Sequence, residues 1–180
     1  MIFKLPDDYK KNNPHIIEQI ISDIKNEKDF HYLFQGCVGC GKTYLAKLIS
    51  KTFEDVKIKY ARSVYREYLS VLDSNYTDKA VAIDKRIHCL RGDFVILDDI
   101  GSEKPRTAGS RSFMEDIIED RYDWIMKGLG KRTVFTTNLT GSELAELYGD
   151  RVVDRLQEAF IIMKFKNYSF RKNKNIVIEG

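Results

Sequence analysis

The sequence predicts an α/β fold, in which five parallel strands form one doubly wound sheet flanked by helices. Two observations support this prediction. Short strand-like segments alternate along the chain with segments whose apolar residues recur at helical spacing. Residues 94–97 are uninterruptedly apolar, as expected of a parallel strand that is buried on both faces. In a sheet of this kind, ligand sites lie at the carboxyl ends of the strands.

The first third of the chain begins irregularly and then supplies two helices and two strands. The predicted helix 14–25 carries isoleucines along one face and begins at Pro14, a residue that suits the first helical turn. Strand 31–35 follows and ends at a glycine-rich loop. Helix 42–53 leaves this loop with leucine and isoleucine spaced to bury one stripe, and residues 57–61 form the second strand.

The rest of the chain continues the alternation. Residues 63–72 and 78–90 are predicted helices, the second with an apolar face opposite a basic one, and strand 94–97 comes next. The helix that follows Thr140 has capping residues at its start, since Thr-Gly-Ser-Glu offers a side chain for each end of a capping box. The last elements alternate as helix 111–127, strand 133–137, helix 142–148 and strand 160–165.

The composition is that of an ordinary globular domain, with 43% hydrophobic and 32% charged residues in a chain of 180. We expect one domain over residues 1–180, with a lead-in and helix at 1–30 and a basic tail at 166–180. No stretch approaches the about 18 apolar residues of a membrane span, and no signal peptide is evident, so we expect a cytoplasmic protein without membrane contact. The net charge of +3 does not indicate a polyanion partner, but positive residues concentrate in 57–91 and 151–180.

The glycine-rich loop is a complete Walker A motif, and it follows a predicted strand and opens a predicted helix. Glycines let backbone N–H groups fold around phosphate oxygens, while the helix presents its positive end to the same anion. Lys42 is expected to contact the β- and γ-phosphates of ATP, and the Thr43 hydroxyl to ligate Mg²⁺. The predicted nucleotide-binding residues are Gly36, Cys37, Val38, Gly39, Cys40, Gly41, Lys42, Thr43 and Tyr44.

Polar side chains are predicted at the ends of two strands that follow one another along the chain. Residues 94–99 read Phe-Val-Ile-Leu-Asp-Asp, a Walker B pattern in which Asp98 holds Mg²⁺ and Asp99 polarises the attacking water. The alternative is an Asp-Asp turn after a core strand. Asn138 ends the next strand, where its amide can orient water against the γ-phosphate, or it is simply a strand-ending asparagine.

Two of the three cysteines, Cys37 and Cys40, form a C-x-x-C inside the phosphate loop. The only other cysteine is Cys89, so a zinc site would lack ligands, and an odd count without framework spacing agrees with a reducing compartment. Thiols near a helix N-terminus have depressed pKa values. We therefore expect the loop to be sensitive to alkylation or oxidation.

With these elements in order, the chain resembles the AAA+ ATPases, and within them the DnaC/DnaI helicase loaders and the IstB transposition helper proteins. The resemblance spans nearly the whole chain. The segments that carry it are GCVGCGKTYLAKLI, VILDDIGSEK, IIEDRY, FTTNLTGSELAELYGDRVVDRL and SFRKNKN. The resemblance implies an AAA+ core with a minimal or absent lid, binding of ATP and Mg²⁺, and weak ATP hydrolysis that DNA or assembly stimulates.

The resemblance also implies roles for four residues. Asn138 matches sensor 1, Arg155 matches the arginine finger that reaches a neighbour's γ-phosphate, with Arg151 as a second candidate, and Arg171 matches sensor 2. A finger acts because a guanidinium offsets charge that develops on the transferred phosphoryl group. As an alternative, Arg171 is a solvated tail residue, and the other two arginines pair on the helix surface with Asp150, Asp154 and Glu158.

In this family, two helices between the second and third strands form an initiator-specific insertion that grips single-stranded DNA, and residues 62–91 match its position. Basic side chains would contact phosphates and aromatic rings would stack on bases. The expected phosphate contacts are Arg62, Arg66, Lys79, Lys85 and Arg86. The aromatic candidates, which at helical spacing are alternatively core residues, are Tyr65, Tyr68 and Tyr76.

The function expected from this resemblance is that of a DnaC-like helicase loader in DNA replication. It would bind ATP·Mg²⁺, assemble with itself into a ring or helical filament, and engage single-stranded DNA and a replicative helicase. An IstB-like transposition helper with a transposase partner is the first alternative, and a nucleotide-dependent binding module that does not hydrolyse ATP is the second. About 30 residues precede the first strand, so we expect the N-terminal partner-binding domain usual in this family to be lacking.

Overall fold

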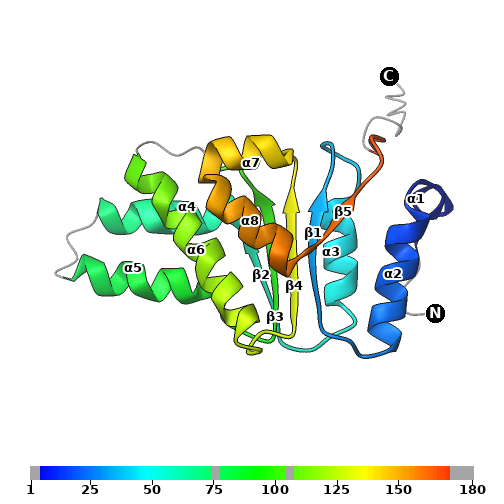
Figure 1. Ribbon diagram of the computed structural model, residues 1–180, viewed down its shortest axis with the longest axis horizontal. Helices are drawn as coiled ribbons and strands as arrows, with labels where there is room; N and C mark the ends of the chain where they lie inside the picture. Colours follow the sequence, from blue (N-terminus) through cyan, green and yellow to red (C-terminus); the bar gives the residue numbers. More distant parts are fainter. Residues whose placement is uncertain (1–4, 74–77, 104–107, 171–180) are drawn as a thin grey trace, which may run out of the picture.

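The computed structural model describes residues 5–73, 78–103 and 108–170, and it confirms the predicted fold class. All five strands pair in parallel, in the order β2-β3-β4-β1-β5. The strands are β1 (Phe30–Gln35), β2 (Val56–Tyr60), β3 (Phe94–Ile100), β4 (Arg132–Thr137) and β5 (Ile161–Lys164). The sheet lies between two layers of helices, and its strands point the same way, so that their carboxyl ends share one edge (Figure 1).

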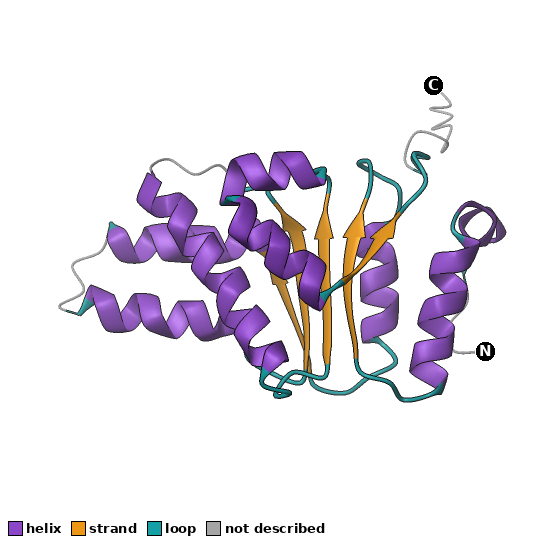
Figure 2. Ribbon diagram, in the orientation of Figure 1, coloured by secondary structure: helices purple, strands orange, loops and turns teal. Residues whose placement is uncertain are grey.

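The helices divide between the two faces of the sheet, as Figure 2 shows. One face is covered by α1 (Asp7–Asn12), α2 (Pro14–Lys25) and α3 (Lys42–Ser50). The other face carries α4 (Ala61–Leu72), α5 (Lys79–Ile87), the 3-10 turn η1 (His88–Leu90), α6 (Ala108–Met126), α7 (Gly141–Tyr148) and α8 (Asp150–Ala159). No helix in the described parts of the chain is long and apolar enough to cross a membrane.

Alternating side chains of the central strands build one core on each face. In β1, Tyr32 and Phe34 join the core beneath α1, α2 and α3, whereas Leu33 joins the core beneath α4, α6, α7 and α8. This alternation follows from the period of two residues in a strand. Because both faces of β3 and β4 are covered, nearly all of their side chains are buried.

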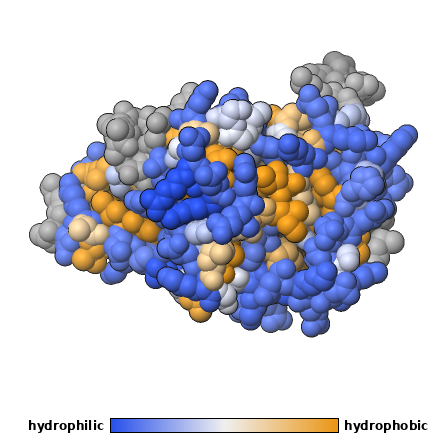
Figure 3. Space-filling view, in the orientation of Figure 1, coloured by the Kyte–Doolittle hydropathy of each residue, from blue (hydrophilic) through white to orange (hydrophobic). Residues whose placement is uncertain are grey.

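Helices do not cover the sheet completely on the α8 side. In the space-filling view, hydrophobic surface gathers over β1 and β5 beside α8 (Figure 3). Ile161 and Ile162 of the edge strand β5 are 52% and 37% exposed. A groove of about 120 Å³ runs between this strand and α8.

A buried arginine stabilises the amino-terminal ends of β3 and β4, at the end of the sheet opposite the phosphate loop. Arg121, from the IIEDRY segment of α6, is fully buried. Its guanidinium donates to the carbonyl oxygens of Leu90 (3.0 Å), Gly92 (2.7 Å) and Arg132 (2.9 Å) and to the hydroxyl of Thr133. Burial lowers the pKa of Arg121 to about 10. These acceptors lie at the starts of β3 and β4, so this part of the motif has a structural explanation.

Some predicted bounds shift, since helix 42–53 ends at Ser50 and helix 78–90 divides into α5 and η1. Three larger differences concern the surroundings of the phosphate loop and the arginines of α8. Helix α1 forms where an irregular start was expected, because the buried ring of Tyr9 packs against the phosphate loop. Strand β3 continues to Ile100 instead of ending at Leu97, so the paired aspartates lie within the strand. Helix α8 follows α7 after a single glycine, Gly149, whose φ of 86° turns the chain sharply.

Candidate nucleotide-binding site

The phosphate loop connects β1 to α3 and depends on glycine at two positions. Gly39 and Gly41 have φ values of 84° and 94°, in the left-handed region that favours glycine. A Cβ atom on Gly41 would lie 2.2 Å from the ring of Tyr9, so no larger residue fits there. None of the described side chains caps the first turn of α3, which leaves its positive end to an anion.

Lys42 is buried at the start of α3, with its ammonium group held by neutral acceptors. Nζ donates to the carbonyl oxygens of Gly36 (2.7 Å) and Cys37 (2.8 Å) and to Oδ1 of Asn138 (2.8 Å). No carboxylate within the described residues forms an ion pair with it. A buried cation without a counter-ion is expensive, so this position favours an anionic ligand.

Three oxygen-bearing side chains meet beside the lysine. The Thr43 hydroxyl donates to both oxygens of Asp98, at 2.8 and 3.1 Å, and the Thr136 hydroxyl donates to Oδ1 of Asp98 at 2.7 Å. These hard oxygen donors fit Mg²⁺, which is held in proteins by one or two carboxylates together with waters and substrate phosphates. The described residues contain no cluster of three or more His, Cys, Asp or Glu that would form an all-protein cage.

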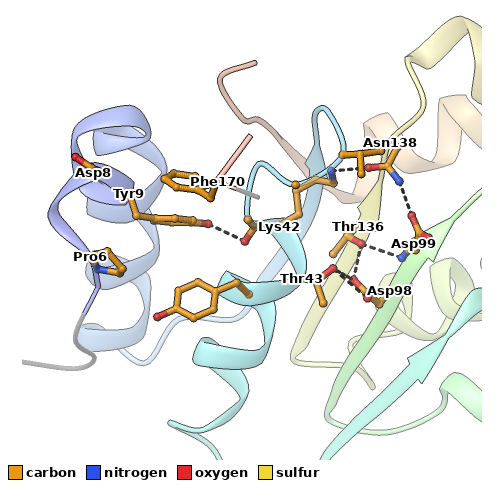
Figure 4. A pocket seen from close by; sticks show the side chains of 14 residues that line it. Pro6, Asp8, Tyr9, Lys42, Thr43, Asp98, Asp99, Thr136, Asn138 and Phe170 are labelled. Atoms are coloured by element: carbon orange, nitrogen blue, oxygen red, sulfur yellow. Dashed lines mark hydrogen bonds between the residues drawn. The ribbon is translucent and has the colours of Figure 1, made fainter. Parts of the chain in front are cut away.

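Asp99 has a strained backbone that turns its side chain away from that of Asp98. Its φ is 63°, and the pairing of β3 with β4 shifts register between Leu97 and Ile100. The Asp99 amide donates to Thr136 (2.8 Å), and the Asp99 carboxylate accepts from Nδ2 of Asn138 (2.6 Å), as Figure 4 shows. A non-glycine residue held in this region at a bulge is typical of functional sites. Asn138 thus bridges Lys42 and Asp99.

A pocket of about 770 Å³ extends from these residues to an aromatic wall, of which the sequence predicts Tyr44 but neither Tyr9 nor Phe170. The wall is formed by Tyr9 and Phe170, whose rings stack at 5.1 Å, and by Tyr44. Burial raises the pKa of Tyr9, and its protonated hydroxyl donates to the carbonyl of Gly41 (2.9 Å). The Phe170 amide donates to Gly39 (3.0 Å), so α1 and the segment that follows β5 are both fastened to the loop.

The sequence matches the family described as IstB-like ATP binding protein over residues 12–177. The chain belongs to this family. It is therefore an ATP-binding domain, in agreement with the resemblance that the motifs indicated. No curated protein matches the sequence closely enough to be compared with it directly.

Solved structures show that this IstB-like protein has the fold of the AAA+ P-loop ATPases. The crystal structure of the DnaC helicase loader matches with a TM-score of 0.64 and 21% identity, over 89% of this chain and 100% of that one. Domain III of the Thermotoga maritima replication initiation protein DnaA matches with a TM-score of 0.61 and 20% identity, over 91% and 69%. AMPPCP-bound DnaA from Aquifex aeolicus matches with a TM-score of 0.60 and 19% identity, over 91% and 48%.

The two candidate arginine fingers of this IstB-like protein lie on α8 and share one acidic partner. Arg155 forms an ion pair with Glu119 of α6 at 2.6 Å, and its guanidinium lies 5.1 Å from the ring centre of Tyr122. Arg151 approaches the same carboxylate at 3.3 Å, and its side chain is 73% exposed. Neither arginine lines the pocket of its own chain. Arg171 lies outside the described residues.

The alternative interpretation, in which Arg151 and Arg155 form ion pairs along the surface of their own helix, is wrong about their partners. It predicts pairs with Asp150, Asp154 and Glu158. Instead, α8 turns them toward α6, and Glu158 accepts a hydrogen bond from the Tyr122 hydroxyl (2.7 Å). Sequence spacing reveals neighbours along a helix, but it does not reveal which helix packs alongside.

The basic residues expected on the helical insertion lie on α4 and α5, which project away from the phosphate loop (Figure 1). Arg62, Arg66 and Lys85 are exposed. Lys79 Nζ donates to the carbonyl of Leu72 (2.6 Å), and Arg86 donates to that of Ala82 (2.8 Å). These positive charges therefore lie on the side of the molecule where β2 is the edge strand of the sheet.

Two of the three aromatic residues suggested for base stacking are core residues. Tyr65 and Tyr68 are 4% and 8% exposed, and Tyr68 stacks on Phe113 of α6 at 4.0 Å. They belong to the buried stripe of α4, which excludes them as stacking platforms for a base. Tyr76 lies outside the described residues.

A buried carboxyl group just after β3 was not foreseen from the sequence. Glu103 is 3% exposed and accepts hydrogen bonds from the Tyr148 hydroxyl and from the Gly101 amide (3.1 Å). Burial raises the pKa of Glu103 to about 7. The pair joins the Walker B segment to the end of α7, directly before the helix that carries the arginines.

Proposed function

We propose that this protein binds and hydrolyses ATP·Mg²⁺ as a DnaC-like helicase loader in DNA replication. The observation that carries the proposal is the connected set of groups at one end of the pocket. Lys42 contacts Asn138, Asn138 contacts Asp99, and Thr43 contacts Asp98. These groups supply an anion site, a water-orienting amide, a carboxylate base and a metal site, and the Thr136 hydroxyl joins the Asp98 carboxylate to the Asp99 amide.

In this proposal, each group has one role in hydrolysis. The loop amides and Lys42 bind the phosphates of ATP, and the adenine ring lies toward Tyr9 and Phe170. Thr43 and Asp98 would hold Mg²⁺, which when bound offsets the charge on the β- and γ-phosphate oxygens. Asp99 accepts a proton from the attacking water, whose orientation Asn138 sets.

Efficient hydrolysis would need a second copy of the chain. Arg151 and Arg155 do not line their own pocket, which favours action on a neighbour's γ-phosphate in a ring or filament. Turnover per protomer is expected to rise with protein concentration and to fall about 10³-fold or more in Arg155→Ala or Arg151→Ala. Glu119→Gln is the matched control, because it removes the ion pair but keeps both guanidinium groups.

The outcome of this experiment separates three explanations. A loss in one arginine variant, with Glu119→Gln active, supports a finger supplied by a neighbour. A loss of equal size in Glu119→Gln would show that the ion pair acts only by holding α8 on α6. Turnover that stays flat across assembly and is unaffected in both arginine variants would remove the self-assembly model.

Engagement of single-stranded DNA is proposed for the basic residues of α4 and α5. Joint replacement of Lys79, Lys85 and Arg86 by Glu should weaken binding and reduce its dependence on salt, because fewer counterions are released. The matched control replaces three exposed lysines elsewhere by Glu and changes the net charge equally. These residues are Lys25, Lys51 and Lys127. Equal losses in the two variants would mean that net charge, and not this surface, governs binding.

The family match favours a second candidate function, that of an IstB-like transposition helper. The two functions require different protein partners. Co-purification of the ATP-bound protein with the replicative helicase of its source would support helicase loading. Co-purification with a transposase encoded beside it would support the transposition function instead.

Tight ATP binding without phosphate release, even with DNA at high protein concentration, would identify a non-hydrolysing module.

A further inference from the structure

We infer that the phosphate loop is a reversible thiol modification site, in which Cys37 and Cys40 form a disulfide when a peroxide oxidises them. We further infer that the oxidised loop binds ATP more weakly than the reduced loop. This second part rests on the proposed nucleotide-binding function. The first part is independent of it.

The backbone of the loop brings the two cysteines within reach of each other. The Cys40 amide donates to the carbonyl of Cys37 (3.4 Å), and Gly39 between them has a φ of 84°. A hydrogen bond from the fourth to the first residue, with positive φ at the third, describes a type II turn. The first and fourth Cα atoms of such a turn lie within about 7 Å, which overlaps the range that a disulfide bridges.

The side chains also approach each other. The Cys37 thiol lies close enough to the Cys40 thiol to raise its pKa, and all three cysteines of the chain are free. Cys37 is half-buried and open to a small oxidant, whereas Cys40 is fully buried. Burial raises the pKa of the Cys40 thiol, while Lys42, whose Nζ lies 3.6 Å from its sulfur, acts in the opposite direction.

The reaction takes place in two balanced steps. The Cys37 sulfur attacks one oxygen of hydrogen peroxide, the O–O bond breaks, and Cys37 becomes a sulfenic acid with release of water. The Cys40 sulfur then attacks the Cys37 sulfur, the S–O bond breaks, and the departing hydroxide leaves as water with the Cys40 proton. Overall, two thiols lose two electrons and two protons, and the peroxide is reduced to two waters.

The disulfide would change the part of the loop that holds the phosphates. A Cβ atom on Gly36 would lie 3.1 Å from the Cys40 sulfur, so this buried sulfur has little room to move. Because the sulfurs must approach to about 2.05 Å, Cys37 must move inward. The carbonyl of Cys37 accepts a hydrogen bond from Lys42. In the proposed site, the amides of the turn residues Val38 and Gly39 would bind the phosphates. Closure therefore displaces the lysine and reshapes the amide cradle.

The experiment compares wild type with Cys37→Ser, Cys40→Ser and Cys89→Ser, each reduced, treated with hydrogen peroxide, and then reduced again. Peptide mapping by mass spectrometry detects the link, and calorimetry measures the affinity for ATP. Oxidation should join Cys37 to Cys40 and weaken ATP binding about tenfold or more, the effect of losing a charge-assisted hydrogen bond, and reduction should restore it. Neither Cys37→Ser nor Cys40→Ser should form the link. Binding by Cys37→Ser, whatever its level, should not respond to oxidation and re-reduction, because this variant lacks the thiol that the peroxide attacks first.

Cys89→Ser is the matched control. Burial raises the pKa of Cys89 to about 11, and this residue lies far along the chain in η1, so its replacement should leave the response intact. Recovery of both loop thiols unlinked after peroxide, or of a stable sulfinic acid on Cys37, overturns the modification site. A link that forms without a change in affinity overturns the regulatory part. If the reduced protein binds no ATP, the proposed function fails, while the mass measurement still decides the modification site.

Discussion

The stability of the folded protein should depend on pH through Glu103, which follows the Walker B strand β3 in the chain. Replacing Glu103 with glutamine should remove this pH dependence. Burial raises the pKa of Glu103 to about 7 from an ordinary value of 4.5, and the nearby Asp99 carboxylate acts in the same direction. Because its pKa is raised on folding, the protonated carboxyl stabilises the folded protein fully below about pH 4.5. That stabilisation is lost as the pH rises through about 7. Between pH 5 and 8, the loss amounts to about 2 to 3 kcal/mol.

Urea unfolding at several pH values tests this prediction. Glutamine keeps the shape of the neutral carboxyl but does not titrate, so the variant should lack this contribution to the slope. The free energy of unfolding of wild type minus that of Glu103→Gln should fall by about 2 to 3 kcal/mol from pH 5 to pH 8. Parallel pH profiles of the two proteins would refute the assignment of a perturbed carboxyl to Glu103.

Two further variants test residues that hold the site and the sheet. In Asn138→Ala, the rate of phosphate release should fall about 10²-fold or more, because Asn138 orients Asp99 and water. The Kd for ATP should change less than about tenfold. A loss of affinity equal to the loss of rate would contradict this role. Arg121→Met should lower the free energy of unfolding by about 3 kcal/mol. The reason is that three backbone carbonyl oxygens at the starts of β3 and β4 lose the hydrogen bonds that the Arg121 guanidinium donates. The half-exposed Arg91 supplies the control, since Arg91→Met should lower it by less than about 1 kcal/mol.

Sequence patterns predicted the elements whose stability comes from local periodicity. The apolar run of β3 and the capping signal at Thr140 both recur in the structure, where Thr140 and Glu143 form a capping box. The Walker A residues also lie where their motif predicts, from the end of β1 into the first turn of α3, because the glycines and the helix start are encoded within eight consecutive residues. Local signals of this kind survive because tertiary packing agrees with them.

The features that the sequence did not predict depend on contacts between distant segments. Helix α1 has only six residues and little helical signal, and it is stabilised by packing of Tyr9 on a loop 32 residues away. The left-handed backbone of Asp99 and the protonation of Glu103 arise from burial and from partners in other elements. A linear pattern contains no information on such environments.

The proposed function requires a single nucleotide site built on the phosphate loop. Isothermal titration calorimetry of ATP with Mg²⁺ into wild type, Lys42→Ala and Lys47→Ala tests it most directly. Lys47 is an exposed lysine on the same helix and serves as the control. We predict that wild type and Lys47→Ala bind one ATP per chain and that Lys42→Ala binds about 100-fold more weakly or not at all. Equal affinity in Lys42→Ala and wild type, or no binding by wild type, would contradict a nucleotide site at the phosphate loop.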